Sequence, residues 1–83
     1  MKEGPGADIV VDARGLYCPV PILRLAKALR GKPPGFSARL FATDPASVGD
    51  VEVFCRERSH ALLESHRDGS LFSFLVRKGD DLS

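Results

Sequence analysis

The segment from Gly15 to Pro21, which reads Gly-Leu-Tyr-Cys-Pro-Val-Pro, constrains the fold of this chain more than any other segment. Proline is accommodated in the first turn of a helix, where its missing N–H has no partner to lose. Pro19 and Pro21 therefore predict a helix start, with Cys18 as its N-cap. Downstream, the apolar residues recur at helical spacing while the basic residues fall elsewhere on the helix: Ile22, Leu25, Ala26 and Leu29 against Arg24, Lys27 and Arg30.

A thiol at this position would lie at the positive end of the helix dipole, which favours the thiolate. Arg14, four residues upstream, adds positive charge if the loop folds back toward the thiol. The two prolines remove two of the amides that a helix start offers to an anion, so mainly the amides of Cys18 and Val20 remain. A phosphate site favours the opposite, a glycine-rich loop with many free amides. The segment therefore predicts one reactive sulfur atom at a solvent-facing corner rather than a nucleotide site.

The length and charge of the chain exclude several classes of protein. Its 83 residues suffice for one small domain, taken as 1–83 with flexible ends at 1–7 and 79–83. The 12 Lys and Arg residues nearly balance the 11 Asp and Glu residues, which disfavours a strongly basic nucleic-acid binder. No apolar run approaches the ~20 residues that span a bilayer, and the first residues lack the apolar core of a signal peptide. We expect a cytoplasmic monomer with free thiols, because a reducing compartment disfavours a disulfide between Cys18 and Cys55.

The rest of the pattern predicts alternating strands and helices. A β-branched run at 8–12 and an alternating run at 36–42 predict two strands, which the intervening helix should join in parallel with a right-handed crossover. That helix should end near Arg30-Gly31. Thr43-Asp44-Pro45 predicts a second helix, with Asp44 as N-cap and Pro45 at the first helical position. Segment 48–55 fits either a strand or a helix, and the Asp-Pro start favours the helix.

Two more strands are expected at 60–67 and 71–76, joined by a tight hairpin turn at Asp68-Gly69-Ser70. In the first of these strands, residues 61, 63 and 65 should lie on one face and residues 62, 64 and 66 on the other. The predicted fold class is therefore α+β, a two-layer α/β sandwich of order β-α-β-α-β-β. A four-stranded mixed sheet is covered on one face by two helices.

Each candidate site residue also has a structural interpretation. A free cysteine often packs as a small apolar residue, but the proline-flanked position of Cys18 disfavours that role. Cys55 lies on the apolar stripe of the second helix, which favours core packing over a resolving thiol. Asp44 is expected to cap the second helix, a contact that alone is worth ~1 kcal/mol.

The charged and histidine residues are less specific signals. The basic face of the first helix fits a docking site for an acidic partner or for tRNA, and it fits equally well a solvated face with cations near the helix C-terminus. Its residues are Arg24, Lys27 and Arg30. His60 and His66 have no thiolate or acidic companions at ligand spacing, so we predict no metal site.

Taken together, these motifs resemble the TusA/SirA family of small sulfur-carrier proteins, whose hallmark is a Cys-Pro-x-Pro motif at the start of the first helix. The resemblance extends from about residue 8 to residue 79. It rests on Asp12, Gly15-Leu16-x-Cys18-Pro19-x-Pro21, Thr43-Asp44-Pro45, Asp50, Phe54-Cys55, His60 and the closing Arg77-Lys78. Position 20, acidic in some relatives, is Val here, and Ser59 stands where a glycine often precedes the histidine.

The resemblance implies a sulfurtransferase of the persulfide-carrier type, without a metal or organic cofactor. The cysteine that matches Cys18 accepts a sulfane sulfur as a persulfide and passes it on. The expected donors are a cysteine desulfurase or a rhodanese, and the expected acceptors are relay proteins of the DsrE type. The sulfur then serves tRNA thiolation, molybdenum-cofactor biosynthesis or cytoplasmic sulfur oxidation. Residues expected to support the site are Gly15, Pro19, Pro21, Arg14 and Asp44.

Two functions of other classes stay open. The small two-layer fold also resembles the C-terminal domain of a translation initiation factor, so a non-catalytic RNA- or protein-binding regulatory module is one alternative. Few aromatic residues and a near-neutral charge disfavour direct nucleic-acid recognition. The other alternative is a thiol redox protein that pairs Cys18 with Cys55. Persulfide transfer itself requires an accessible, partly ionised thiol and little else.

Overall fold

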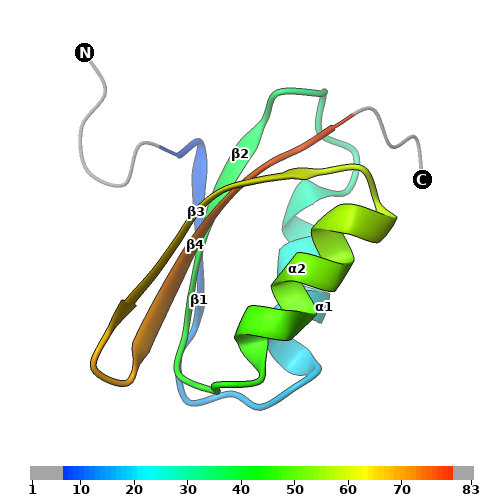
Figure 1. The fold of residues 1–83 in the computed structure, drawn as a ribbon. Helices are drawn as coiled ribbons and strands as arrows, with labels where there is room; N and C mark the ends of the chain where they lie inside the picture. Colours follow the sequence, from blue (N-terminus) through cyan, green and yellow to red (C-terminus); the bar gives the residue numbers. More distant parts are fainter. Residues whose placement is uncertain (1–6, 80–83) are drawn as a thin grey trace.

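The structure is a computed structural model that describes residues 7–79 (Figure 1). Its elements, in chain order, are β1 (Ile9–Ala13), α1 (Val20–Leu29), β2 (Ser37–Ala42), α2 (Ser47–Glu57), β3 (Ala61–Asp68) and β4 (Leu71–Arg77). The predicted order and the α+β class are confirmed, and the ambiguous segment 48–55 is helical. The ends expected to be flexible, 1–7 and 79–83, lie outside the described residues except for Ala7 and Gly79.

The strands form one mixed sheet in the order β1-β2-β4-β3. β1 and β2 are parallel, with Val11 opposite Leu40 and Ala13 opposite Ala42, as expected for two strands joined by a helix. β4 is antiparallel to both of its neighbours. Both helices cover the same face of this sheet (Figure 1). Neither described helix is long and apolar enough to cross a membrane.

The core lies between the sheet and the two helices. α1 buries Pro21, Leu25 and Leu29, and α2 buries Ser47, Val51 and Cys55, so each helix turns one stripe of residues inward. Ile22 and Ala26, which share the apolar helical spacing, are only half-buried. The sheet contributes alternate residues of its strands, namely Val11, Ala13, Ala38, Leu40, Phe72, Phe74 and Val76.

The turns follow the glycine signals, while β3 departs from strict alternation. α1 ends at Leu29 with Arg30 as its C-cap, and Gly31 has a φ of +77° that favours glycine. The predicted hairpin turn is confirmed, because Asp68 pairs with Leu71. The predicted two-face alternation of β3 was wrong in its first half: the pairing register shifts between Leu62 and Glu64, and this bulge interrupts the period of two.

Candidate functional site

The parallel pairing of β1 and β2 brings two loops together at one edge of the sheet. Because Ala13 lies opposite Ala42, the loop after β1 and the loop after β2 leave the sheet side by side. The amide of Gly15 donates a hydrogen bond of 2.9 Å to Oγ1 of Thr43. The amide of Cys18 donates one of 2.8 Å to Oδ2 of Asp44. The second loop therefore fixes the backbone of the loop that carries the sulfur.

Gly15 has a structural reason to be glycine. Its φ is +80°, in the left-handed region where a Cβ is unfavourable. This conformation turns the chain away from β1 while the Gly15 amide still reaches Thr43. The structure thus gives Gly15 a role in shaping the Cys18 loop.

The predicted cap of α1 was wrong by one residue. The first helical residue is Val20 and the N-cap is Pro19, so Cys18 precedes the cap. The amide of Val20 donates to the carbonyl of Tyr17 at 2.8 Å, and the amide of Cys18 is bound to Asp44. Both amides that the sequence left for an anion are therefore already occupied, which agrees with the absence of a nucleotide motif.

The predicted start of α2 was also wrong. The helix begins at Ser47 with Ala46 as its N-cap, and Asp44 makes no cap hydrogen bond to the helix itself. Instead, Oδ1 of Asp44 accepts the amide of Ala46 at 3.1 Å, while Oδ2 accepts the amide of Cys18. These two backbone hydrogen bonds favour the ionised carboxylate and hold the pKa of Asp44 below its usual 3.8. Asp44 thus joins the two loops rather than capping α2.

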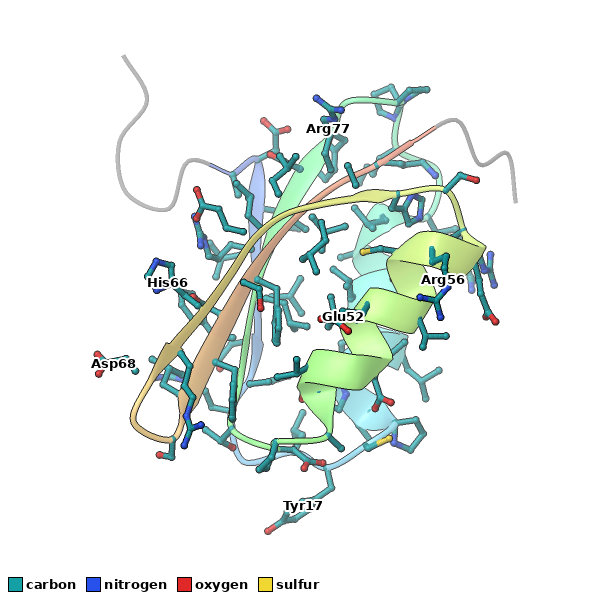
Figure 2. The ribbon with its side chains drawn as sticks, in the orientation of Figure 1. Tyr17, Glu52, Arg56, His66, Asp68 and Arg77 are labelled. Atoms are coloured by element: carbon teal, nitrogen blue, oxygen red, sulfur yellow. The ribbon has the colours of Figure 1, made fainter. Side chains whose placement is uncertain are left out.

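Cys18 is exposed and lies at a groove between the two helices. The groove has a volume of about 360 Å³. One side of the groove is lined by Pro19, the N-cap of α1, and by Ile22 of α1. The other side is lined by residues of α2 and its C-cap, namely Asp50, Val53, Phe54, Glu57 and Arg58. Tyr17, the neighbour of Cys18, is 75% exposed and projects away from the body of the protein (Figure 2). The sulfur is therefore accessible from solvent.

The electrostatic environment of the thiol is the reverse of the predicted one. The pKa of Cys18 is raised, chiefly because its thiol donates a hydrogen bond to the Asp50 carboxylate, with further contributions from desolvation and from the negative charges of Asp50 and Asp44. Arg14 does not support the thiolate. Its Nε donates to Oδ1 of Asp12 at 2.9 Å, and this pairing lowers the pKa of Asp12 to about 2. The side chains that act on the thiol are therefore two carboxylates, Asp50 and Asp44, and not Arg14.

Asp50 is a candidate site residue that the sequence pattern did not predict. It belonged to the family resemblance but was given no role, because a residue in the first turn of a helix is most simply explained by the helix dipole. Asp50 lies in the first turn of α2 and lines the same groove as Cys18. Only the packing of the two helices shows that this carboxylate faces the sulfur.

The structure does not gather the basic residues of α1 around Cys18. Arg24 and Lys27 line a separate open groove of about 520 Å³, together with Val10 and Asp12 of β1. Arg30 lies at the other end of α1, beyond its last residue. None of the three lines the Cys18 groove within the described part of the chain.

Cys55 differs from Cys18 chiefly in its exposure to solvent. It is 4% exposed, and burial raises the pKa of its thiol to about 11. Both cysteines are free. Cys55 packs in the core on the buried stripe of α2, as its position in the sequence predicts. These observations disfavour a redox pair formed with Cys18.

The histidines lie apart from the sulfur. His60 packs against Phe54, with 5.3 Å between ring centroids, and its Nδ1 accepts the amide of Gly79. His66 projects from β3, on the far side of the sheet from α2 in the view of Figure 2. Among residues 7–79, no group of three or more His, Cys, Asp or Glu side chains is arranged to hold a metal ion.

Comparison with known proteins assigns the chain to a family. Residues 9–78 match the family described as Sulfurtransferase TusA. The chain belongs to the TusA family. It is 42% identical to the sulfur carrier protein TusA of Allochromatium vinosum over 71 aligned residues. These aligned residues cover 86% of this chain and 93% of that protein.

The TusA-family fold is also seen in a solved structure. The crystal structure of a SirA-like protein from Desulfitobacterium hafniense superposes with a TM-score of 0.75, covering 87% of this chain and 99% of that chain. The two share 22% sequence identity, so this likeness concerns the fold. The α+β architecture predicted from the sequence is confirmed by this match.

Proposed function

We propose that this TusA-family protein is a sulfur carrier that accepts a sulfane sulfur as a persulfide on Cys18 and relays it to an acceptor protein. The observation that carries the proposal is the position of Cys18. It is an exposed thiol at the start of a helix, beside a groove that is open to solvent. The membership of the chain in the TusA family supports this assignment.

The transfer step requires two sulfur-bearing side chains. The Cys18 thiol first loses its proton to solvent or to the partner, because the thiolate is the nucleophile. The thiolate attacks the terminal sulfur of a donor persulfide, a new S–S bond forms on Cys18, and the S–S bond of the donor breaks. The electron pair of that bond leaves on the donor sulfur as a thiolate. Delivery repeats the exchange, with an acceptor thiolate attacking the terminal sulfur on Cys18.

The carboxylates around Cys18 keep the free carrier in its less nucleophilic form. The hydrogen bond to Asp50 and the nearby charge of Asp44 favour the protonated thiol. A partner that presents cationic side chains to these carboxylates would offset their charge and lower the pKa of the thiol. Activation of Cys18 would then be coupled to docking, so that the carrier reacts at its partners and little in solution.

The surface beside the sulfur offers apolar contacts for such a partner. Tyr17, next to Cys18 in the chain, is 75% exposed, and Val53 of the groove is also exposed. Exposed aromatic and aliphatic side chains next to a reactive atom suit a transient protein contact. Arg24 and Lys27 of α1 and Arg30, its C-cap, stay proposed docking residues outside the Cys18 groove. Donors of the cysteine desulfurase or rhodanese type, and acceptors of the DsrE type, are the partners that we propose.

The proposal is tested by loading the protein with sulfur. The wild-type protein, Cys18→Ser and Cys55→Ala are each incubated with a cysteine desulfurase and cysteine, and their intact masses are measured before and after reduction. We expect one reducible sulfur atom on the wild type and on Cys55→Ala, and none on Cys18→Ser. Loading of Cys18→Ser, or an internal disulfide that requires both cysteines, would contradict the proposal.

A further inference from the structure

The groove beside Cys18 is lined by more carboxylates than cations. Asp50 and Glu57 both line it, and because they are seven residues apart on α2 they lie on the same face of that helix. Asp50 is in direct contact with the sulfur, since its carboxylate accepts the hydrogen of the Cys18 thiol. Arg58 is the one cation among the described lining residues, and it already interacts with another group of the protein.

Asp44 adds a further negative charge on the backbone side of the reacting residue. Its Oδ2 accepts the amide of Cys18 at 2.8 Å, and its Oδ1 accepts the amide of Ala46 at 3.1 Å. These two hydrogen bonds favour the ionised carboxylate and lower the pKa of Asp44. The fold therefore holds a fixed negative charge next to Cys18, in addition to the carboxylates of the groove.

The start of α1 offers little compensation to an anion that approaches the sulfur. A helix N-terminus binds anions through its free amides. Pro19 and Pro21 have no amide hydrogen. The amide of Cys18 is taken by the neighbouring carboxylate, and the amide of Val20 donates to the carbonyl of Tyr17 at 2.8 Å. An anion at Cys18 would therefore meet carboxylates without the amide contacts that helix starts usually supply.

We infer that Asp50, supported by Asp44 and Glu57, selects the sulfur donors of Cys18 by their charge. Donors that are uncharged or cationic beside the reacting S–S bond reach the sulfur, whereas small anionic sulfane-sulfur compounds, thiosulfate among them, are repelled. The inference rests on the proposed function, because it names the class of donor from which the carrier takes sulfur. Asp50 acts here on the incoming donor, an effect separate from its hold on the thiol proton.

The repulsion is strongest in the transfer step. Attack of the Cys18 thiolate on thiosulfate would form an S–S bond on Cys18 and break the S–S bond of the donor, with the electron pair leaving on sulfite. The thiolate and the doubly charged donor would then meet beside the carboxylates. Each like-charge pair about 4 Å apart slows such a step by roughly fivefold in water, and by more in a partly enclosed groove. A protein donor can instead present cations to the same carboxylates.

Three methanethiosulfonates of different charge test this selection. The methyl compound is neutral, the 2-(trimethylammonio)ethyl compound is a cation and the 2-sulfonatoethyl compound is an anion. In each, the Cys18 thiolate attacks the alkylated sulfur, a mixed disulfide forms, and methanesulfinate leaves with the electron pair of the broken S–S bond. Rates are measured by stopped flow in a Cys55→Ala background. The same protein unfolded in urea gives the intrinsic rate of each reagent.

We expect the folded protein to prefer the cationic reagent over the anionic one by about tenfold or more, relative to the unfolded protein, at low ionic strength. This preference should fall severalfold in about 0.5 M sodium chloride, because salt screens exposed charges. The same thiolate attacks every reagent, so the ratio of two rates does not depend on the ionised fraction of Cys18. The raised pKa of the thiol therefore cancels from this measurement.

Matched variants assign the preference to the groove. Asp50→Asn should reduce it severalfold, and Glu57→Gln, at an exposed position of the groove, should reduce it by less. Glu52→Gln removes the same charge from an exposed position of α2 outside the groove lining (Figure 2) and should leave it unchanged. A preference equal to that of the unfolded protein, unchanged in Asp50→Asn, or lowered equally by Glu52→Gln would overturn the inference.

Sulfur loading by a cysteine desulfurase, followed by intact mass, separates this inference from the proposed function. A protein that loads sulfur on Cys18 but shows no charge preference would overturn the inference and leave the proposed function standing. A protein that shows the charge preference but takes no sulfur from the desulfurase would contradict the proposed function and leave the electrostatic selection at Cys18 standing.

Discussion

The amide of Cys18 donates a hydrogen bond of 2.8 Å to Oδ2 of Asp44, which fastens the sulfur-bearing loop to the loop before α2. The second oxygen of the same carboxylate accepts the amide of Ala46. One ionised side chain therefore joins two loops that are 26 residues apart in the sequence. This arrangement makes the local structure of the site dependent on the charge of Asp44.

We predict that the contribution of Asp44 to stability is lost in acid. Its pKa in the folded protein lies below the usual 3.8, so the ionised carboxylate stabilises the fold above that pH, and this contribution disappears as the pH falls through the lowered value. Asp44→Asn should therefore be less stable than the wild type at neutral pH, and the difference should shrink below about pH 3.8.

Urea unfolding at a series of pH values measures this difference. Asp68→Asn, at the exposed β3–β4 turn (Figure 2), is the matched control for the loss of one carboxylate. A difference in the free energy of unfolding between Asp44→Asn and the wild type that is the same at all pH values would contradict the prediction.

We predict that Asp50→Asn makes Cys18 more reactive. The Asp50 carboxylate accepts the thiol hydrogen and raises the pKa of Cys18, so neutralising it should lower that pKa and shift the alkylation profile toward lower pH. Asp44→Asn should shift the profile in the same direction but by less, because Asp44 contributes less than Asp50 to the raised pKa of Cys18. The rate of iodoacetamide modification, followed against pH in a Cys55→Ala background, gives the measurement.

Glu52→Gln serves as the control for the Asp50 experiment, since Glu52 is exposed on α2 and does not line the groove. Its alkylation profile should coincide with that of the parent protein. An Asp50→Asn profile that also coincides with the parent, or that moves to higher pH, would show that Asp50 does not hold the thiol proton.

We predict that the two cysteines differ sharply in native reactivity. Cys18 is exposed, whereas Cys55 is 4% exposed and burial raises its pKa to about 11. A thiol reagent should therefore modify one cysteine rapidly in the native protein and both in denaturant. Peptide mapping after a short pulse of reagent should find the label on Cys18. Equal labelling of both cysteines under native conditions would refute this difference.

We predict that Ser59→Gly stabilises the protein. Ser59 has a φ of +61°, in the left-handed region where a Cβ is unfavourable. Glycine removes that strain but loses more backbone entropy on folding, so the net gain should be about 0.5–1 kcal/mol. Thermal and urea unfolding measure the gain. Ser59→Ala, which keeps the Cβ, is the control and should show no such increase in stability. A loss of stability in Ser59→Gly would contradict the prediction that the Cβ of Ser59 strains the backbone.

The chain by itself determined the order of the elements and the position of the candidate thiol beside the start of α1. Proline restricts where a helix can begin, glycine marks where it can end, and β-branched and alternating runs mark the strands, all of which are local effects. Pro19 and Pro21 thus located the start of α1 to within one residue, and Gly31 located its end. The burial of Cys55 also followed from a local pattern, the apolar stripe of α2.

The tertiary structure alone decided the electrostatics of the site. The charge around Cys18 depends on side chains from another loop and another helix, Asp44 and Asp50, which the β1–β2 register and the packing of α1 beside α2 bring close. Arg14 is nearer in sequence, yet it pairs with Asp12. Because electrostatic interactions depend on distance in space, the sequence located the sulfur but not the sign of its pKa shift.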